Sequence, residues 1–450
     1  MLVNTLGTSE KIISGEPKMT YMTEVFKKKS RCSNQLITMQ FNINSIYGSE
    51  SLIELYQEGD LIDGVWLRLN YPAGQPTTVV DSFGTEIIDW VQLEYGDKVI
   101  ERLYGEFILF INDLDTPFGK ASTLQNMTGR STTTNLTTYT IKLPFSAFKQ
   151  GLPICALSEN VKIRFNLNTF STGCPTGTDP QIFNATLLIN YLFLENDERD
   201  YFNNSKLDYL LEQTQFASYN LVPKFTSKLF NYPIISLKTD TTCRFNFSNP
   251  IPSQITVVMT FTGSVSATTY TFNSNSISPD TNVNRVATFT INSGILARNT
   301  IAYSGVSPTN VTVQISGLQD SPNPISIFTS FRNSCKELYI SSPSLTGLRI
   351  VLDDKEYLKT ETATTMFLST YQGFYNYSGQ PNADCFMYPF CLDPYKVSGS
   401  INFGMIERQQ FDFYVNAAST VNMYMRSYNI MQIQDGKLAM LFYTPTDITL

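Results

Sequence analysis

Apolar and polar residues alternate along most of this 450-residue chain, in short runs that are separated by turn-forming residues. Side chains of a β-strand point to opposite faces in turn, so this alternation predicts strands that bury one face. Residues 61–69 alternate around Trp66, and residues 87–103 are typical of a hairpin that turns at Gly96 and Asp97. Further strands are predicted at 35–43, 139–143, 161–167, 184–194, 234–239, 243–247, 254–262, 286–292, 310–316, 347–352 and 400–415. This density of strands indicates an all-β sandwich architecture.

Helical patterns are few, and one of them divides the chain. Residues 103–113 predict one short helix after the hairpin. The clearer pattern lies at 195–213, where Glu195 and Arg199 are spaced four residues apart. Since this segment lies near the middle of the chain, it predicts a helical linker between two domains of ordinary size. The predicted boundaries are 1–30 for an N-terminal arm, 31–196 for the first domain, 197–213 for the linker and 214–450 for the second domain.

One stretch of the second domain, residues 263–330, is rich in Ser, Thr, Asn and Pro and yet keeps some alternating runs. We interpret it as a loop-rich insertion that projects from the second domain.

Charge argues against nucleic acid as a partner. The formal net charge is −7 and only 16% of residues are charged, whereas contacts to phosphates need Lys and Arg. No sequence-specific nucleic-acid binding is predicted. A low charge fraction is instead typical of a protein that covers much of its surface with copies of itself. The exception is a basic cluster, Lys27, Lys28, Lys29 and Arg31, which is either a solvated face or an arm that touches an acidic partner.

The chain has no His, which removes the commonest general base, the Ser–His and Cys–His nucleophile pairs and the commonest zinc ligand. The seven Cys form no CxxC pair and are predicted to be scattered free thiols. No glycine-rich phosphate loop occurs. We therefore predict no catalytic residue, no metal site and no cofactor, and conclude that the chain is not an enzyme.

Acidic and aromatic clusters each leave two interpretations. Paired carboxylates could serve a glycosidase, but Asp60 and Asp63 flank a predicted strand start, and Asp353-Asp354 is typical of a hairpin turn. A third cluster, Asp197, Glu198 and Asp200, is assigned to an exposed helix face. Three neighbouring aromatic residues, Phe374, Tyr375 and Tyr377, could form either a sugar-binding platform or part of a protein interface.

Seven glycosylation sequons occur, and Asn126, Asn135 and Asn310 are the better glycan candidates because they fall in predicted loops. The N-terminal residues do not have the pattern of a secretory signal, and no apolar run approaches the ~18 residues of a membrane span. Both observations favour a soluble chain that is synthesised in a cytosol.

The C-terminal region carries the most specific pattern. Residues 398–407, SGSINFGMIE, and residues 423–444, MYMRSYNIMQIQDGKLAMLFYT, resemble the closing signature of major capsid proteins from nucleocytoplasmic large DNA viruses. The matching positions are Ser398, Gly399, Asn402, Phe403, Ile406, Tyr428, Asn429, Ile433 and Gly436. Three residues, Gly404, Met405 and Glu407, depart from the Ser-Arg-x-Asp pattern that is common in that family.

Three other regions resemble the same family in the same order. Residues 7–31 are similar to its N-terminal arm, with Gly15, Pro17 and Thr20 in place. Residues 388–394 resemble the strand before the closing motif. Residues 191–216 resemble its inter-domain linker, with matches at Glu198, Arg199, Tyr209, Leu210, Glu212, Gln213 and Phe216. The resemblance spans nearly the whole chain except residues 263–330.

The resemblance implies a double jelly roll, in which two eight-stranded β-sandwiches are joined by a short helical linker. It implies a homotrimer that forms a pseudo-hexagonal tile, lateral contacts between trimers in an icosahedral shell, and minor capsid and penton proteins as partners. The basic cluster would then face inward, toward minor capsid proteins or an internal membrane. The expected location is the virion capsid, after synthesis in the host cytoplasm. Two alternatives stay open: a scaffolding protein of the same fold, and a carbohydrate-binding or hydrolytic β-sandwich protein.

Overall fold

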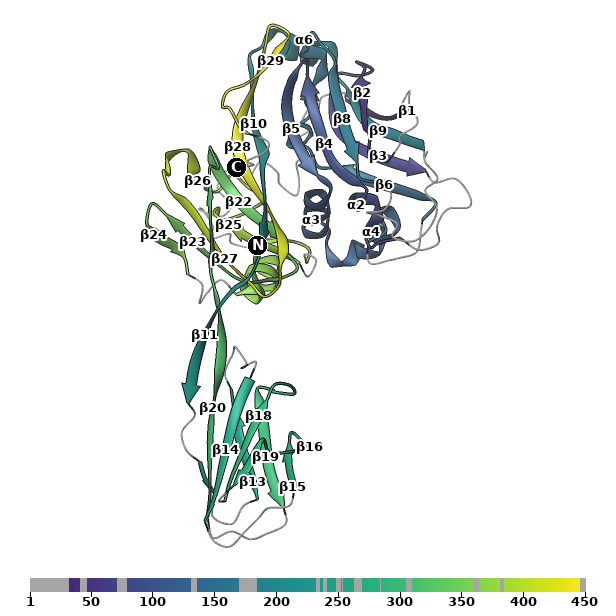
Figure 1. Ribbon diagram of the computed structural model, residues 1–450. Coiled ribbons are helices and arrows are strands. Elements are labelled where there is room, and N and C mark those ends of the chain that lie inside the picture. Colours follow the sequence, from purple (N-terminus) through teal and green to yellow (C-terminus); the bar gives the residue numbers. More distant parts are fainter. Residues whose placement is uncertain are drawn as a thin grey trace, which may run out of the picture. The chain divides into compact units, whose positions relative to one another are not determined.

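The computed structural model describes residues 32–40, 47–70, 79–130, 136–169, 184–231, 235–237, 241–247, 252, 254–262, 269–283, 285–304, 310–359, 364–380 and 384–445. Gly15, Pro17, Lys27, Lys28, Lys29, Arg31 and Asn135 lie outside these ranges. The chain forms two compact units (Figure 1). The first unit comprises residues 1–112, 120–212 and 429–443, and the second comprises 113–119, 213–428 and 444–450.

The first unit is a sandwich of two antiparallel sheets. One sheet has the order β1 (Ser33–Gln40), β9 (Asn184–Phe193), β3 (Leu61–Asn70), β6 (Thr138–Leu143), and β7 (Leu152–Pro153) also pairs with β3. The other has the order β2 (Glu50–Leu55), β8 (Val161–Leu167), β4 (Ile88–Tyr95), β5 (Lys98–Tyr104). Sequence neighbours such as β1 and β2 lie in different sheets, which is the jelly-roll arrangement.

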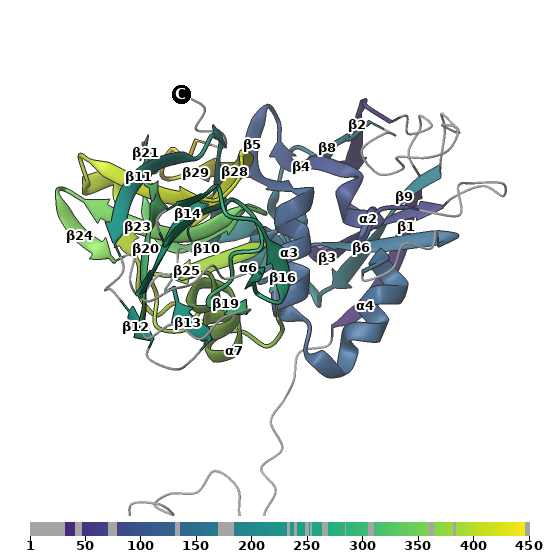
Figure 2. The same cartoon turned by 60° about the horizontal axis from the view of Figure 1, so that its bottom comes forward.

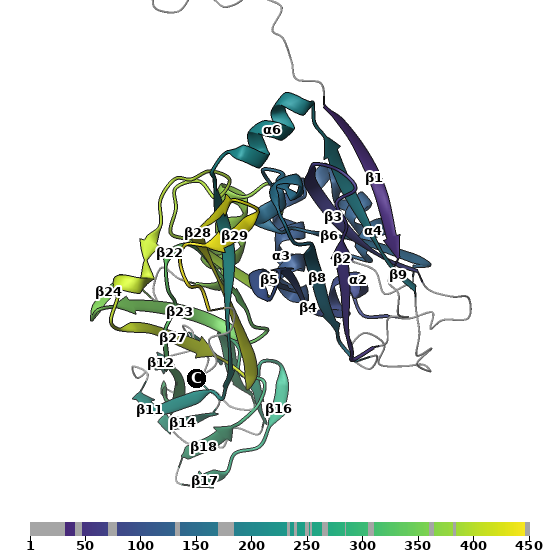
Figure 3. The same ribbon diagram turned by 90° about the horizontal axis from the view of Figure 1, so that it is seen from above.

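Alternation explains why these segments are strands. Along β8, residues Val161, Ile163, Phe165 and Leu167 are buried and the residues between them are not, so one face of the strand enters the core. The predicted hairpin is also present, because Tyr95 pairs with Lys98 across the Gly96-Asp97 turn. Figure 3 shows β1 at the edge of its sheet, next to β9.

Helices fill the connections of the first unit. Helix α2 (Phe83–Glu86) precedes β4, and α3 (Gly105–Asp115) and α4 (Ala121–Thr128) follow β5. Helix α3 confirms the helix predicted at 103–113, and Figure 2 shows α4 beside β6. Asn126 is exposed on α4, so its assignment to a loop was wrong. Short 3-10 turns are η1 (Phe118–Lys120), η2 (Ser146–Phe148) and η3 (Ile154–Ala156).

The linker is shorter than predicted. Helix α6 (Asn196–Asn204) ends well before residue 213, and β10 (Leu207–Leu221) begins three residues later. The helical prediction failed because Leu207 and Leu211, four residues apart, share one face in both a helix and a strand. Hydrogen bonding with the neighbouring strand decides the outcome, since β10 is an edge strand paired with β28 (Ser419–Gln434).

The second unit repeats the same strand order. One sheet is β10, β28, β22 (Ser334–Ser341), β25 (Cys385–Pro389), with β26 (Ile401–Asn402) beside β22 and β29 (Lys437–Met440) beside β28. The other is β21 (Ile325–Thr329), β27 (Gln409–Val415), β23 (Leu345–Leu352), β24 (Lys355–Leu358). Every strand of the first sandwich has a counterpart here, since the short β26 pairs with β22 as β7 pairs with β3, so the fold is a double jelly roll, as predicted.

Two details of the second half differ from the prediction. Residues 400–415 are β26, a 3-10 turn η5 (Phe403–Met405) and β27 rather than one strand. Residues 429–443 belong to the first unit, although 214–450 was predicted as one domain. The reason is that β28 is 16 residues long, so its C-terminal part and β29 extend into the first unit. The predicted turn at Asp353-Asp354 is confirmed, since both residues have a positive φ between β23 and β24.

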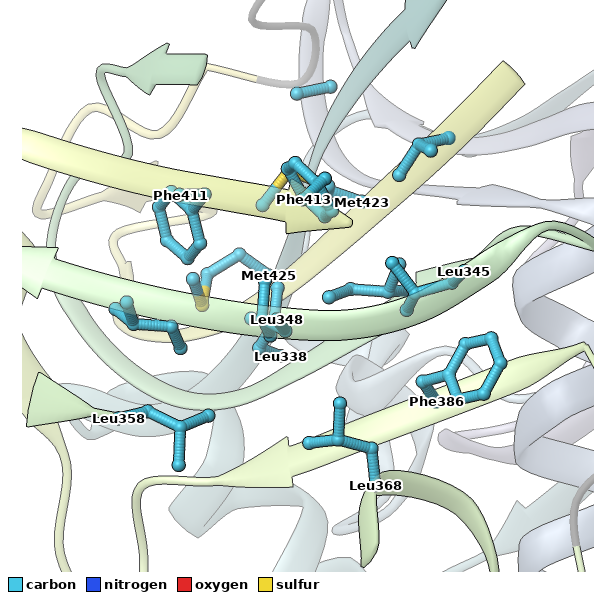
Figure 4. Packing of buried hydrophobic residues seen from close by; sticks show 14 of the residues in the cluster. Leu338, Leu345, Leu348, Leu358, Leu368, Phe386, Phe411, Phe413, Met423 and Met425 are labelled. Atoms are coloured by element: carbon cyan, nitrogen blue, oxygen red, sulfur yellow. The ribbon is translucent and has the colours of Figure 1, made fainter. Parts of the chain in front are cut away.

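The core of the second sandwich is built from alternate residues of facing strands (Figure 4). Phe411 and Phe413 of β27 and Met423 and Met425 of β28 are fully buried there, together with Leu348 of β23. The connection between β24 and β25 adds Leu368 from a π-helical turn, η4 (Phe367–Tyr371), which runs directly into α7 (Gln372–Asn376).

Residues 224–323, between β10 and β21, form a further β-sandwich, which we call the insertion. One sheet contains β11 (Lys224–Asn231), β20 (Asn310–Asn323), β14 (Gln254–Thr262), β18 (Val286–Ile291), β17 (Thr281–Val283) and β12 (Ile235–Leu237). The other contains β13 (Thr242–Asn246), β19 (Arg298–Ser304), β15 (Thr269–Phe272) and β16 (Asn275–Ile277).

The prediction of a loop-rich insertion at 263–330 is therefore corrected in two respects. The insertion spans residues 224–323, and it is a β-sandwich. The insertion has its own core, which includes Val257, Phe261, Phe289 and Ile301. The Ser and Thr residues that suggested loops occupy the other faces of strands such as β15 and β18, because β-branched and polar residues suit a half-buried strand. Asn310 begins β20 and is thus not a loop residue either.

Candidate functional site

Two residues of the linker motif fix helix α6 within the first unit. The Arg199 guanidinium donates from Nε and Nη2 to the two oxygens of Asp60, at 2.6 and 3.0 Å. The Leu194 backbone N–H also donates to Asp60, at 2.7 Å. The buried carboxylate holds the pKa of Arg199 above its usual range, mainly through this hydrogen bond. Glu198 donates its backbone N–H to the Glu195 carbonyl, which closes the first turn of α6.

This geometry decides the role of the acidic pair at 60 and 63. Asp60 is buried and paired with Arg199, whereas Asp63 accepts only a long contact of 3.4 Å from Asn190 on the exposed side of the sheet. One carboxylate is thus committed to an ion pair and the other is solvated. The interpretation of these two residues as strand-flanking groups is supported over a glycosidase pair.

The remaining linker motif residues lie on β10. Glu212 pairs with Lys149 at 2.9 Å, and its backbone N–H donates to Ser146 Oγ at 3.1 Å. Gln213 is buried, and its carbonyl accepts from Ser427 Oγ at 3.4 Å. Leu210 is exposed, and nothing in the structure explains its place in the motif.

The closing motif at 398–407 is a tightly bonded turn in the second unit. Ser398 Oγ donates to the Asp393 carbonyl at 2.8 Å and accepts from the Asp393 N–H at 2.7 Å. Asn402 accepts from the Gly404 N–H at 3.0 Å and thereby caps η5. Gly399 has a φ of +132°, a conformation that L-residues rarely adopt.

Phe403 carries this turn into the core. It is buried, and its ring lies 5.5 Å from Phe390 and 6.3 Å from Phe331. Ile406 packs against the same cluster. Gly404, Met405 and Glu407, the residues that depart from the family pattern, are all exposed. The motif positions that match therefore have structural roles, and the differences fall on the surface.

The final motif residues form and anchor a hairpin. Asp435 and Gly436 both have a positive φ between β28 and β29, which is a conformation that a two-residue hairpin turn requires. The Gly436 carbonyl accepts hydrogen bonds from Tyr95 Oη at 2.7 Å and from the Ser158 N–H and Oγ at 2.8 Å each. All of these residues belong to the first unit.

Asn429 holds the strand that follows. Its Nδ2 donates to the Phe442 carbonyl at 2.7 Å, and its Oδ1 accepts from the Phe442 N–H at 3.1 Å. Tyr428, the last residue of β28 in the second unit, has the Lys336 ammonium 6.0 Å from its ring centroid. Both residues therefore have structural roles on β28.

The aromatic residues at 374–377 do not form one platform. Tyr377 Oη donates to Glu337 at 3.0 Å and lies 3.3 Å from Tyr339 Oη, inside a network that includes the Glu337–Arg426 ion pair at 3.2 Å. Burial raises the pKa of Tyr377 well above its usual value. Phe374 and Tyr375 are exposed instead, so a sugar platform made of all three residues was a wrong interpretation.

The residues that the structure describes contain no cluster of three or more acidic or Cys residues that could hold a metal ion. Among the described cysteines, Cys32, Cys155, Cys243, Cys335 and Cys391 are free thiols. Within the same described ranges, no helix is both long and apolar enough to cross a membrane.

Several anchoring residues escaped the sequence analysis. Tyr95, Ser158, Glu337 and Arg426 make the contacts above, and none lies in a recognised motif. Tyr95 and Gly436 are 341 residues apart in sequence, so only the fold brings them together. A charged residue at an apolar position of a strand, as Glu337 is in β22, was the one available signal.

Comparison with known proteins matches the motifs and the fold to one family. Residues 20–195 match the family model described as "Major capsid protein N-terminus". The chain is similar to viral major capsid proteins. It is 24% identical to the major capsid protein of Pyramimonas orientalis virus over 253 residues, which cover 51% of this chain and 62% of the relative. It is 21% identical to the major capsid protein of Phaeocystis pouchetii virus, over 96% of both chains.

The alignments differ in how much of each relative they cover. Capsid protein 1 of Acanthamoeba polyphaga mimivirus is 24% identical, and the chain spans 46% of its length. The chain thus spans about half to two thirds of two of these relatives and nearly all of a third. The resemblance predicted from the motifs is confirmed: these relatives of the chain are capsid proteins of large double-stranded DNA viruses.

Solved structures agree with the double jelly roll. The PBCV-1 virus capsid superposes with a TM-score of 0.61 at 18% identity, over 94% of this chain and 100% of that one. The Faustovirus major capsid protein superposes with a TM-score of 0.52 at 9% identity, over 92% of this chain and 93% of that one. The matches cover both sandwiches, and at these identities they establish the fold.

Proposed function

We propose that this chain is the major capsid protein of a large double-stranded DNA virus and works by assembly rather than by catalysis. One observation carries the proposal: the chain contains the same eight-stranded sandwich twice, with the same strand order. Three copies around a threefold axis would supply six like sandwiches, which gives a tile with a nearly hexagonal outline. Hexagonal tiles can pave the facets of an icosahedral shell through repeated lateral contacts.

The motif residues have a structural role in this proposal. Arg199, Glu212, Gln213, Asn402, Phe403, Asn429 and Gly436 hold the ends of the two sandwiches, as their contacts above support. Rigid sandwich ends favour assembly, because a flexible subunit would lose conformational entropy each time it joins the shell. No reacting group is required, and the chain is proposed to have no enzymatic activity.

The partners proposed beyond the chain itself are those that the motif resemblance implies. Minor capsid and penton proteins are the proposed neighbours of the tile, and the proposed location is the virion capsid after synthesis in the host cytoplasm. The basic cluster Lys27, Lys28, Lys29 and Arg31 is proposed to face inward, toward minor capsid proteins or an internal membrane. Asn126, Asn135 and Asn310 remain proposed glycan sites, of which Asn126 is exposed on α4.

The first experiment measures the mass of the purified chain by size-exclusion chromatography with light scattering. A stable species of three times the chain mass is expected. A monomer that binds oligosaccharides would contradict the proposal and favour a carbohydrate-binding sandwich. The scaffolding alternative is separated by quantifying the chain in purified virions, where a capsid protein is the most abundant protein and a transient scaffold is absent.

A further inference from the structure

Two connections in equivalent positions of the sandwiches have opposite exposure. In the first sandwich, α3 lies in the connection between β5 and β6. In the second sandwich, η4 and α7 stand between β24 and β25, the counterparts of β5 and β6. The pair of segments therefore allows a direct comparison of helices that the duplicated fold places alike.

Helix α3 is buried along nearly its whole length within the chain. Phe107, Ile108, Leu109, Phe110 and Ile111 are five consecutive buried residues. A helix that is apolar on all sides is found inside a protein, because no face suits water. The single chain supplies all of the cover that α3 needs.

The continuous helix at 365–376, formed by residues 365 and 366, η4 and α7, lacks such cover. Figure 2 labels its last part, α7. Its inner face packs into the core through Leu368, and Gln372 is buried. Its outer face exposes Met366, Tyr371, Phe374 and Tyr375, with relative exposures of 73%, 51%, 79% and 73%. We call these four residues the aromatic ridge.

The aromatic ridge has the composition of an interface core. Residues 364–380 contain no charged side chain, and depletion of charge with enrichment of Tyr, Phe and Met marks the centre of protein interfaces. At ~200 Å² for each full side chain, the exposed part of the four residues amounts to roughly 500 Å². That is close to the largest patch a monomer normally exposes, and more than half of the ~800 Å² that one partner contributes to a standard interface.

Aromatic rings stack on one another along this helix. Phe367 and Tyr371 stack with centroids 5.3 Å apart and an interplanar angle of 15°, and Tyr371 and Tyr375 stack at 5.8 Å and 4°. Tyr371 thus lies parallel to one aromatic ring on each side along the helix, and it is still 51% exposed. A run of uncharged aromatic side chains of this kind suits an apolar protein surface.

We propose that the aromatic ridge docks onto a second copy of this chain and forms the subunit contact of the trimer. The inference rests on the proposed function. In a ring of six like sandwiches, equivalent helices have similar surroundings. The chain itself covers α3, so the equivalent helix of the second sandwich must be covered by the next copy. A charge-free ridge also lets two chains of net charge −7 approach without added repulsion.

The test compares the wild-type chain with Phe374→Glu/Tyr375→Glu by light scattering across a concentration series. Both side chains are exposed, so the thermal unfolding midpoint of the monomer should not change. Introducing two carboxylates per contact should raise the concentration at half-trimerisation by roughly 100-fold or more. The matched control is Tyr201→Glu, which replaces an exposed aromatic residue of α6 and should leave the trimer intact.

A second readout covers the case in which the variant fails to fold. A photo-crosslinking phenylalanine analogue at position 375 of the otherwise wild-type chain should join two copies covalently, and the same group at 201 should not. A wild-type chain that is monomeric would overturn the proposed function. A wild-type trimer that persists in the double variant, or that yields no crosslink from position 375, would overturn this inference alone.

Discussion

The two jelly rolls carry the same strands in the same order, yet their connections differ greatly. The step from β1 to β2 takes residues 41–49, whereas the equivalent step from β10 to β21 contains the whole insertion. Conversely, residues 71–87 with α2 join β3 to β4, and only residues 342–344 join β22 to β23. Strand order is held by the buried cores, while connections outside them can change length at low cost.

The largest effect is expected when the insertion is removed. Its ends are already side by side, since Lys224 pairs with Asn323 across β11 and β20, and paired strands lie only ~5 Å apart. Replacing residues 224–323 with a short Gly-Ser linker should therefore leave the second jelly roll folded. Differential scanning calorimetry should show that one unfolding transition disappears and that the transition of the jelly rolls stays.

Loss of all cooperative unfolding in that deletion variant would show that the insertion is part of the jelly-roll core. A matched control is Phe289→Ala, which truncates a buried ring of the insertion core and costs about 3–5 kcal/mol. It should lower the midpoint of the same transition that the deletion removes.

An intermediate effect is expected from a carboxyl group that only the first jelly roll carries. Burial, followed by repulsion from Glu106 and Asp81, raises the pKa of Glu86 to about 7. Because the folded state keeps a proton that the unfolded chain releases, the free energy of unfolding should fall as the pH rises from about 4.5 to 7. Glu86→Gln should remove this slope and stabilise the chain above pH 7 by about 1–3 kcal/mol.

Chemical denaturation at several pH values measures this effect. The control Glu407→Gln, at an exposed position of the second unit, should keep the wild-type pH profile. A Glu86→Gln variant that follows the wild-type profile would mean that the carboxyl group is hydrated rather than buried.

The smallest effect concerns the hairpin at the end of β28, which has no counterpart after β9. Gly436 has a φ of +73°, and an added Cβ would lie 3.1 Å from Ser158 Cβ. Gly436→Ala should cost about 1–2 kcal/mol, from backbone strain and this contact. Gly294 has a similar φ of +70° with nothing within 4 Å of an added Cβ, so Gly294→Ala should cost less. Equal losses of stability in the two variants would show that Ser158 moves away from the added Cβ at no cost.

Local patterns predicted the strands well and the long-range contacts poorly. The alternation along β8 and the Gly96-Asp97 hairpin could be read directly, because burial of one face imposes a period of two. The end of α6 could not, since Leu207 and Leu211 suit both a helix and a strand. Pairing decided that case, and it depends on β28, about two hundred residues away.

The motif residues were found from the sequence, but their roles came from the structure. Gly436 and Asn402 have local explanations, a turn with positive φ and a cap, which a sequence pattern can carry. The Asp60–Arg199 pair joins residues that are 139 positions apart. The local sequence around Asp60 indicates a strand flank or a glycosidase carboxylate, and it does not indicate this ion pair. The fold of the insertion was missed because its sheet depends on the pairing of its two distant ends.

The most direct test of the central claim is a cryo-electron microscopy reconstruction of the purified chain. The account predicts particles with threefold symmetry and six jelly-roll densities arranged around one axis, with the 365–376 helix at the contact between copies. Particles of a single chain with two jelly rolls, at concentrations where capsid proteins assemble, would contradict it.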